Sequence, residues 1–165
     1  MKQRTLSILV DNTAGVLSRV AGLFSRRNYN IDSLTVGVTA DNRYSRITVV
    51  ATGDDQVLEQ ITRQVSKLVD VKAVKVLDPD NSVQRELIMI KVKCNASQRQ
   101  DIVSLASIFR ASIIDVGKES LIIEATGAKG KLEALKELLN GFEILEVART
   151  GVTGLSRGIE DVTYL

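Results

Sequence analysis

The sequence predicts an α+β fold made of two tandem βαββαβ units, each closed as a ferredoxin-like sandwich. The first observation is a regular change of apolar period, from two in predicted strands to 3.6 in predicted helices. The second is a return of the same element order after a linker. The third is a repeated helix stripe: Leu17, Val20, Ala21 and Phe24 recur 85 positions later as Ile102, Leu105, Ala106 and Phe109. Each unit is therefore expected to place two helices on one face of a four-stranded antiparallel sheet.

The first unit begins with alternating Leu6, Ile8 and Val10, followed by an amphipathic helix. Asn28 tolerates the left-handed conformation that closes a helix, so the chain is expected to turn there into the next strand. The expected elements are strand 3–11, helix 14–27, a strand through 34–38, strand 45–52, a helix starting at 53–55 and strand 71–77.

The segment 78–82 carries the only proline of the chain and is the strongest linker signal. We therefore predict domains at 1–78 and 84–165, joined by a linker at 79–83, with a tail at the end of the second domain. The expected elements of the second unit are strand 87–94, a helix capped at 95–97, strands 113–116 and 121–125, a helix with its stripe at 132–142, and strand 144–149. The offset between the repeats falls from 85 to 74 after the first helix, which shortens the second unit's central hairpin by about 11 residues.

Composition excludes several functional classes. The chain has 165 residues, 44% of them apolar, and its 22 basic and 20 acidic residues nearly cancel. These values favour a soluble cytoplasmic protein without a nucleic-acid-binding patch, and no run of about 18 apolar residues predicts a membrane span. With no histidine and a single cysteine, Cys94, the usual zinc sites, the Ser-His-Asp triad and an internal disulfide are excluded. We predict no metal site, and an enzyme would have to work with carboxylates, Lys, Ser, Thr or Tyr.

The stretch Asp11–Val20 joins the first strand to the first helix through small and cap-forming residues. Unpaired N–H groups at a helix N-terminus attract carboxylates and phosphates, so we interpret this stretch as a ligand-binding turn. The simpler interpretation is a helix cap, which local sequence alone favours. The second unit starts its helix with Ser97-Gln98-Arg99-Gln100-Asp101 and has no glycine there, so the fold does not require the first turn.

The sheet face opposite the helices is expected to stay open in the first unit. It would carry Leu9, Val36 or Val50, which favours pairing with another copy. A unit of about 75 residues is also small for a self-sufficient core. We therefore expect an obligate homo-oligomer, most simply a homodimer.

Several stretches carry a specific likeness to a known family. They are 12–20, 22–24, 27–34 and 70–71 in the first unit, and 109–110, 113–115, 146–151 and 155–158 beyond it. Together they resemble the small regulatory subunit of acetolactate synthase (acetohydroxyacid synthase), which belongs to the ACT-domain family. Two positions depart from the pattern: Ala14 stands where many ACT domains have proline, and Asn28 where glycine often precedes the Tyr-Asn-Ile run.

The resemblance implies a non-catalytic, allosteric chain of branched-chain amino acid biosynthesis. It implies that the chain activates a separate catalytic subunit and confers feedback inhibition by valine or a related amino acid. Thiamine diphosphate, Mg and FAD would belong to that catalytic partner, with no cofactor in this chain. The effector would lie between the ACT domains of a homodimer, and the implied effector-binding residues are Asn12, Ala14, Gly15, Val16, Leu17, Asn30 and Ile31.

Roles for these residues follow from their chemistry. Backbone N–H groups near Gly15 and Val16 would hold the effector carboxylate, and a side-chain oxygen of Asn12 or Asn30 would accept from its ammonium. Val16, Leu17 and Ile31 would line an aliphatic pocket, with Asn30 and Ile31 supplied by the partner chain. A methylene changes binding in such a pocket by only about 1–3 kcal/mol, so valine, leucine and isoleucine all stay open.

Two other functions remain as alternatives. One is an ACT protein that senses an amino acid and acts on a different enzyme. The other is a small acylphosphatase-like enzyme, but that chemistry needs an arginine after the first strand, and Asp11–Gly15 contains none. The tail 150–158 is read either as a flexible glycine-rich end or, together with the second unit, as a contact for the catalytic subunit.

Overall fold

The computed structural model describes residues 1–159 and confirms the two βαββαβ units. One compact unit, called unit 1 here, contains Met1–Gln84 and the segment from Gly151 onward. The other, unit 2, contains Arg85–Thr150. The chain thus passes from unit 1 into unit 2 and returns to unit 1.

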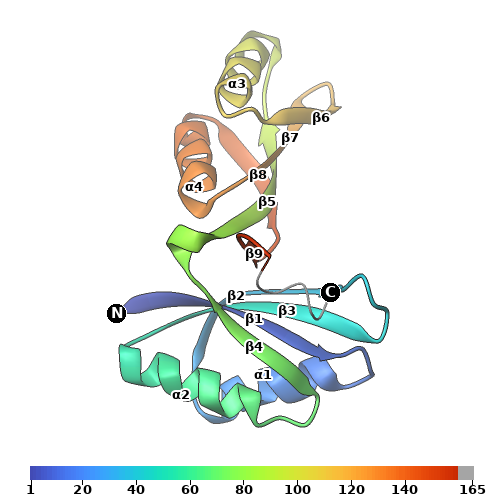
Figure 1. The fold of residues 1–165 in the computed structure, drawn as a ribbon. Coiled ribbons are helices and arrows are strands. Elements are labelled where there is room, and N and C mark those ends of the chain that lie inside the picture. The colour runs from blue at the N-terminus through green and yellow to red at the C-terminus, as the bar shows by residue number, and fades with distance from the viewer. Residues whose placement is uncertain (160–165) are drawn as a thin grey trace. The chain divides into compact units, whose positions relative to one another are not determined.

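Unit 1 is a sheet in the order β2-β3-β1-β4, with both helices on one face (Figure 1). All its strand pairs are antiparallel. Its elements are β1 Lys2–Asp11, α1 Val16–Arg26, β2 Asn30–Val38, β3 Tyr44–Gly53, α2 Asp55–Ser66 and β4 Val71–Leu77. The core lies between helices and sheet and is built from Leu6, Ile8, Val10, Val20, Phe24, Ile47, Val49, Leu58, Ile61 and Val65, among others.

Local chemistry explains where the unit 1 helices end. Asn28 has φ 55°, and its N–H and that of Tyr29 bond back to carbonyls of α1, so the predicted left-handed helix closure is confirmed. The Tyr29 ring then packs edge-on against Phe24, with centroids 6.1 Å apart. The first turn of α2 is held by Asp54, whose side chain accepts from the N–H of Val57.

Unit 2 repeats the arrangement with the sheet order β6-β7-β5-β8 (Figure 1). Its elements are β5 Ser82–Lys93, α3 Ala96–Ile108, β6 Ser112–Val116, β7 Ser120–Gly127, α4 Lys129–Leu138 and β8 Glu143–Arg149. The predicted stripe of the last helix continues past α4, because Leu139 begins a 3-10 turn, η2, at Leu139–Gly141. Within residues 1–159, no helix combines the length and apolarity that crossing a bilayer requires.

The division into units differs from the expected domains at both junctions. Residues 79–83 are structured: Pro79–Asn81 forms the 3-10 turn η1, and β5 begins at Ser82, five residues before the predicted strand. The tail belongs to unit 1. It contains a short strand that the sequence analysis did not predict, β9 at Thr153–Ser156, which pairs with β5. Backbone bonding explains this placement, since Arg157 N donates to Asn81 O at 2.9 Å.

We call Gly151–Ser156 the return segment. It approaches unit 1 closely at two glycines. A Cβ on Gly151 would lie 2.8 Å from Leu34 O, and one on Gly154 would lie 2.9 Å from Val83 O. Between them, Val152 N donates to Ser33 Oγ at 3.0 Å. Glycine at these two positions therefore permits the segment to lie directly against unit 1's backbone.

The prediction that Leu9, Val36 and Val50 share an open face of unit 1 is wrong. Leu9 and Val50 are buried within the single chain. Val36 pairs with Ile47, a core residue, so its side chain belongs to the helix-covered face rather than to the face of Val50. On the outer face, Leu77 is buried next to Gly154 of the return segment. Exposed Val36 and Val38 instead lie on β2, the strand that begins the sheet order.

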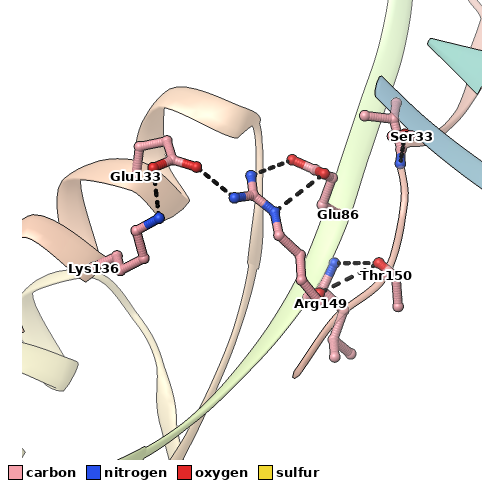
Figure 2. Close-up of polar contacts among 8 residues, drawn as sticks. Ser33, Glu86, Glu133, Lys136, Arg149 and Thr150 are labelled. Atoms are coloured by element: carbon pink, nitrogen blue, oxygen red, sulfur yellow. Dashed lines mark hydrogen bonds and ion pairs between the residues drawn. The ribbon is translucent and has the colours of Figure 1, made fainter. Parts of the chain in front are cut away.

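A charged network ties together the strands at which the chain enters and leaves unit 2 (Figure 2). The guanidinium of Arg149 on β8 binds both oxygens of Glu86 on β5, at 2.7 and 3.3 Å, and also binds Glu133 on α4. Lys136 pairs with Glu133 at 3.2 Å. Glu86 is only 6% exposed, and its hydrogen bond is the main reason that the pKa of Arg149 is raised. Beside the network, Thr150 N and Leu87 O bond at 3.0 Å.

Candidate functional site

The N-terminus of α1 is open. Gly15 is its N-cap, with φ 85°, and no side chain caps the helix. Arg19 N is the first helix donor to be satisfied, by Gly15 O at 3.0 Å. Within residues 1–159, no hydrogen bond joins the N–H groups of Val16, Leu17 or Ser18 to any acceptor. Three donors at the positive end of the helix dipole are thus left for a bound anion such as a carboxylate.

A cation stands beside this turn. Arg19 binds Asp70 through two hydrogen bonds, from Nε at 2.5 Å and from Nη2 at 3.0 Å. The remaining nitrogen, Nη1, lies 2.8 Å from the place of a Cβ on Gly15. The hydrogen bond to Asp70 raises the pKa of Arg19, and the same bond lowers the pKa of Asp70. The guanidinium is thereby fixed over the turn and adds positive charge where the free N–H groups lie.

Asn12 fixes the other side of the turn. Its Nδ2 donates to Asn42 O at 2.9 Å, and its Oδ1 accepts from Ser45 Oγ at 3.2 Å. Its backbone N–H donates to Arg43 O at 2.8 Å. The side chain thus holds the turn against the β2–β3 connection and keeps one lone pair of Oδ1 for another donor. Ala14 is exposed next to Gly15.

The two apolar residues at the start of α1 have different surroundings. The side chain of Val16 is buried in the core of unit 1, so a ligand at the turn would meet its backbone N–H rather than its methyl groups. Leu17 is 43% exposed and offers the apolar surface next to the turn. The expected aliphatic wall therefore reduces to Leu17 at this end of the unit.

Asn30 and Ile31 lie at the opposite end of the same sheet. Asn30 pairs with Thr52, which in turn pairs with Gln3, at the start of β1. The turn follows Asp11, at the other end of β1. At about 3.3 Å per residue the two ends are about 26 Å apart. A single chain therefore does not bring Asn30 and Ile31 to the turn. Ile31 packs partly into the core, and Asn30 Nδ2 donates to Asp32 Oδ1 at 2.7 Å.

Three charged residues near the α1 turn and the start of β2 were not predicted from the sequence as site residues. They are Arg19, Asp70 and Asp32. Arg19 and Asp70 are 51 positions apart, so no local pattern links them. A partial signal existed, because Arg19 lies one helical turn after Gly15.

The corresponding helix of unit 2 has a side-chain cap. Asn95 accepts from the N–H of Gln98, whose side chain accepts from the N–H of Asn95, forming a complete capping box. Ser97 Oγ also donates to Asn95 at 2.7 Å. Of the two helices that follow a unit's first strand, α1 therefore has no side-chain cap at its N-terminus, whereas the Asn95 side chain binds the first turn of α3. Helix α4, at a different place in the unit, also has no side-chain cap.

The fold and the open turn define the first unit as an ACT-type domain, and the family described as "AHAS small subunit-like ACT domain" matches residues 6–73. The family described as "Small subunit of acetolactate synthase" matches residues 85–158. The chain belongs to the acetolactate synthase small subunit family, as its resemblance to that family implied.

Relatives support this over nearly the whole length. The chain is 50% identical over 157 residues to the acetolactate synthase small subunit of Mycobacterium bovis, covering 95% of this chain and 94% of that protein. It is 49% identical over 154 residues to a probable small subunit of Methanothermobacter thermautotrophicus, covering 93% and 92%. The crystal structure of the small subunit from Thermotoga maritima has a TM-score of 0.90 and 43% identity, covering 96% of this chain and 99% of that one.

Proposed function

We propose that this chain is the regulatory subunit of a cytoplasmic acetolactate synthase. It activates a separate catalytic subunit and makes that subunit sensitive to inhibition by valine or another branched-chain amino acid. Family membership supports the assignment to this synthase. Thiamine diphosphate, Mg and FAD are proposed for the catalytic partner and not for this chain.

The observation that carries the proposal is the open N-terminus of α1 beside the guanidinium of Arg19. Three unbonded N–H groups, a helix dipole and a fixed cation suit the carboxylate of an amino acid. At α3 the side chain of Asn95 already occupies the helix N-terminus, so we place the effector in unit 1. Asn12, Ala14, Gly15, Val16 and Leu17 form this half of the proposed site.

We propose that a second copy supplies the other half, Asn30 and Ile31. In a two-fold antiparallel pairing along β2, the Asn30 end of one copy lies beside the Val38 end of its partner. Val38 pairs with Ser45, the residue that bonds Asn12 at the turn. Such a homodimer would bring Asn30 of one copy toward the turn of the other. Exposed Val36 and Val38 would be covered in the process.

An effector bound between copies has a direct route to regulation. It shifts the balance between two dimer arrangements only by the difference in its affinity for them. A difference of about 2 kcal/mol corresponds to roughly a 30-fold change in the ratio of the arrangements. The catalytic partner would respond to that ratio.

Co-purification with an acetolactate synthase catalytic subunit tests the proposal. Acetolactate formation is measured with the catalytic subunit alone, with the chain added, and with valine, leucine or isoleucine present. We expect activation by the chain and inhibition only when both chain and effector are present. Binding of an amino acid without any effect on the synthase would favour the alternative, an ACT sensor that acts on another enzyme.

Sedimentation at micromolar concentration tests the homodimer. A folded monomer under these conditions would contradict the two-copy site. As a directed variant, Val38→Lys places a charge on the proposed contact, and we expect it to weaken the dimer and effector binding together. Val69→Lys, at an exposed turn after α2, serves as the matched control.

A further inference from the structure

The start of β2 carries a carboxylate that receives three hydrogen bonds. Asp32 accepts from Asn30 Nδ2 at 2.7 Å, from Gln3 Nε2 at 3.3 Å and from Thr52 Oγ1. The donors belong to β2, β1 and β3, and strand register places Gln3, Thr52 and Asn30 in one row across the sheet. Asp32 lies at a β-bulge, where the β2–β3 register shifts between Ile31 and Ser33. The bulge admits the extra residue and places its carboxylate against the row.

This contact decides how the Asn30 amide is oriented. The NH₂ group points to Asp32, because a carboxylate accepts hydrogen bonds and cannot donate one when ionised. The amide oxygen then has no donor among residues 1–159. An oxygen held in this way can accept from an ammonium group.

The charge of Asp32 is also uncompensated in the described part of the chain. Its three partners are neutral, and none of the ion pairs within residues 1–159 includes it. Asp70 and Asp41, by contrast, each bind an arginine. A carboxylate with only neutral donors keeps its attraction for a cation.

We propose that Asp32 is a positioning and specificity residue for the effector's α-ammonium group. It turns the Asn30 oxygen toward that group and supplies the negative charge that favours it. The open turn of α1 carries positive charge. The carboxylate of an amino acid would therefore bind the turn of one copy, and its ammonium group would bind the Asn30 end of the other copy. The inference rests on the proposed function and adds the feature by which the site distinguishes an α-amino acid from a plain carboxylic acid.

Calorimetry on the full chain tests it with two probes. One is L-valine, and the other is 3-methylbutanoate, which has the same carboxylate and isopropyl group but no ammonium group, measured by its displacement of valine. We expect Asp32→Asn to weaken valine binding about tenfold and to change 3-methylbutanoate binding less than twofold. Asp32→Glu keeps the charge and should recover most of the valine affinity. Asp101→Asn, at an exposed position in unit 2, should leave both affinities unchanged.

Asn30→Ala provides a second route to the same answer, because it removes the accepting oxygen while Asp32 remains. Asn30→Ala should also lower the ratio of valine affinity to 3-methylbutanoate affinity. Equal weakening of both probes by Asp32→Asn, or an unchanged ratio, would overturn the role of Asp32 while leaving the proposed function in place. Failure of the unaltered chain to bind valine, leucine or isoleucine would overturn the proposed function and this inference together.

Discussion

Arg19 and Asp70 form a two-bond ion pair that holds a guanidinium directly over Gly15. The Asp70 side chain is 12% exposed and that of Arg19 is 50% exposed, so a largely buried carboxylate anchors a half-exposed guanidinium. Its position explains why the turn after β1 suits a negatively charged group.

Replacing Gly15 tests the turn directly. Gly15→Asp adds a carboxylate where the effector's own carboxylate is proposed to lie, so we expect it to abolish binding of valine in calorimetry. Gly15→Asn is the control, because asparagine has nearly the volume of aspartate, tolerates the positive φ at this position and has no charge. It should weaken binding without abolishing it. Retention of full affinity by Gly15→Asp would contradict the assigned site.

Acid should weaken unit 1 through Asp70. Its pKa is lowered in the folded chain by the hydrogen bond from Arg19, below the ordinary value of about 3.9. The ion pair therefore stabilises the fold fully above that ordinary value, and this stability is lost as the pH falls through the lower, folded-state pKa. Urea unfolding should show Asp70→Asn to be less stable at neutral pH and to lose less stability below about pH 4. An acid dependence identical to that of the unaltered chain would contradict this role.

Unit 2 should depend on Arg149. Arg149→Ala leaves Glu86 as a buried charge without its bidentate partner, which typically costs about 3 kcal/mol. Hydrogen exchange should show the loss in Arg85–Thr150. Lys136→Ala is the control, because it removes only a half-exposed ion pair of the same network, and its effect should stay under about 1 kcal/mol. Equal effects of the two variants would argue against a structural role for the buried bond.

Close approach of the return segment predicts a sharp size limit at Gly154. A methyl group there would lie 2.9 Å from the backbone oxygen of Val83, so Gly154→Ala should destabilise unit 1 by about 1–3 kcal/mol. Gly141→Ala has open space around it and should change the free energy of unfolding by less than about 0.5 kcal/mol. Thermal unfolding of both variants provides the comparison.

A contact of the tail with the catalytic subunit stays a prediction. Truncation after Arg149 should weaken activation, but it also removes β9 and the cover over Leu77. Leu155→Asp separates the two effects, because Leu155 lies within β9 and is 55% exposed. We expect it to reduce activation of the synthase with little change in unfolding, whereas Val69→Asp should leave activation intact. Full activation by the truncated chain would refute the contact.

Sequence patterns predicted elements whose signals are local. Alternation in Leu6, Ile8 and Val10 and the helix stripes were enough for both units, and Asn28 adopts its expected positive φ. Strand β9 escaped prediction because its four residues, Thr-Gly-Leu-Ser, resemble a loop, and their partners lie about 70 positions earlier. The pair Arg19–Asp70 and the bonds of Asp32 escaped for the same reason. They join residues that only the folded sheet brings together.

The nested order of the units also governs how the chain is made. Unit 2 has all of its residues once Thr150 has been synthesised, whereas unit 1 still lacks the segment from Gly151 that contains β9. On the ribosome, the domain that begins first is therefore completed last. A nascent chain stalled before Gly151 would carry every residue of unit 2 attached to a unit 1 without its return segment, and β5 would still lack its partner β9.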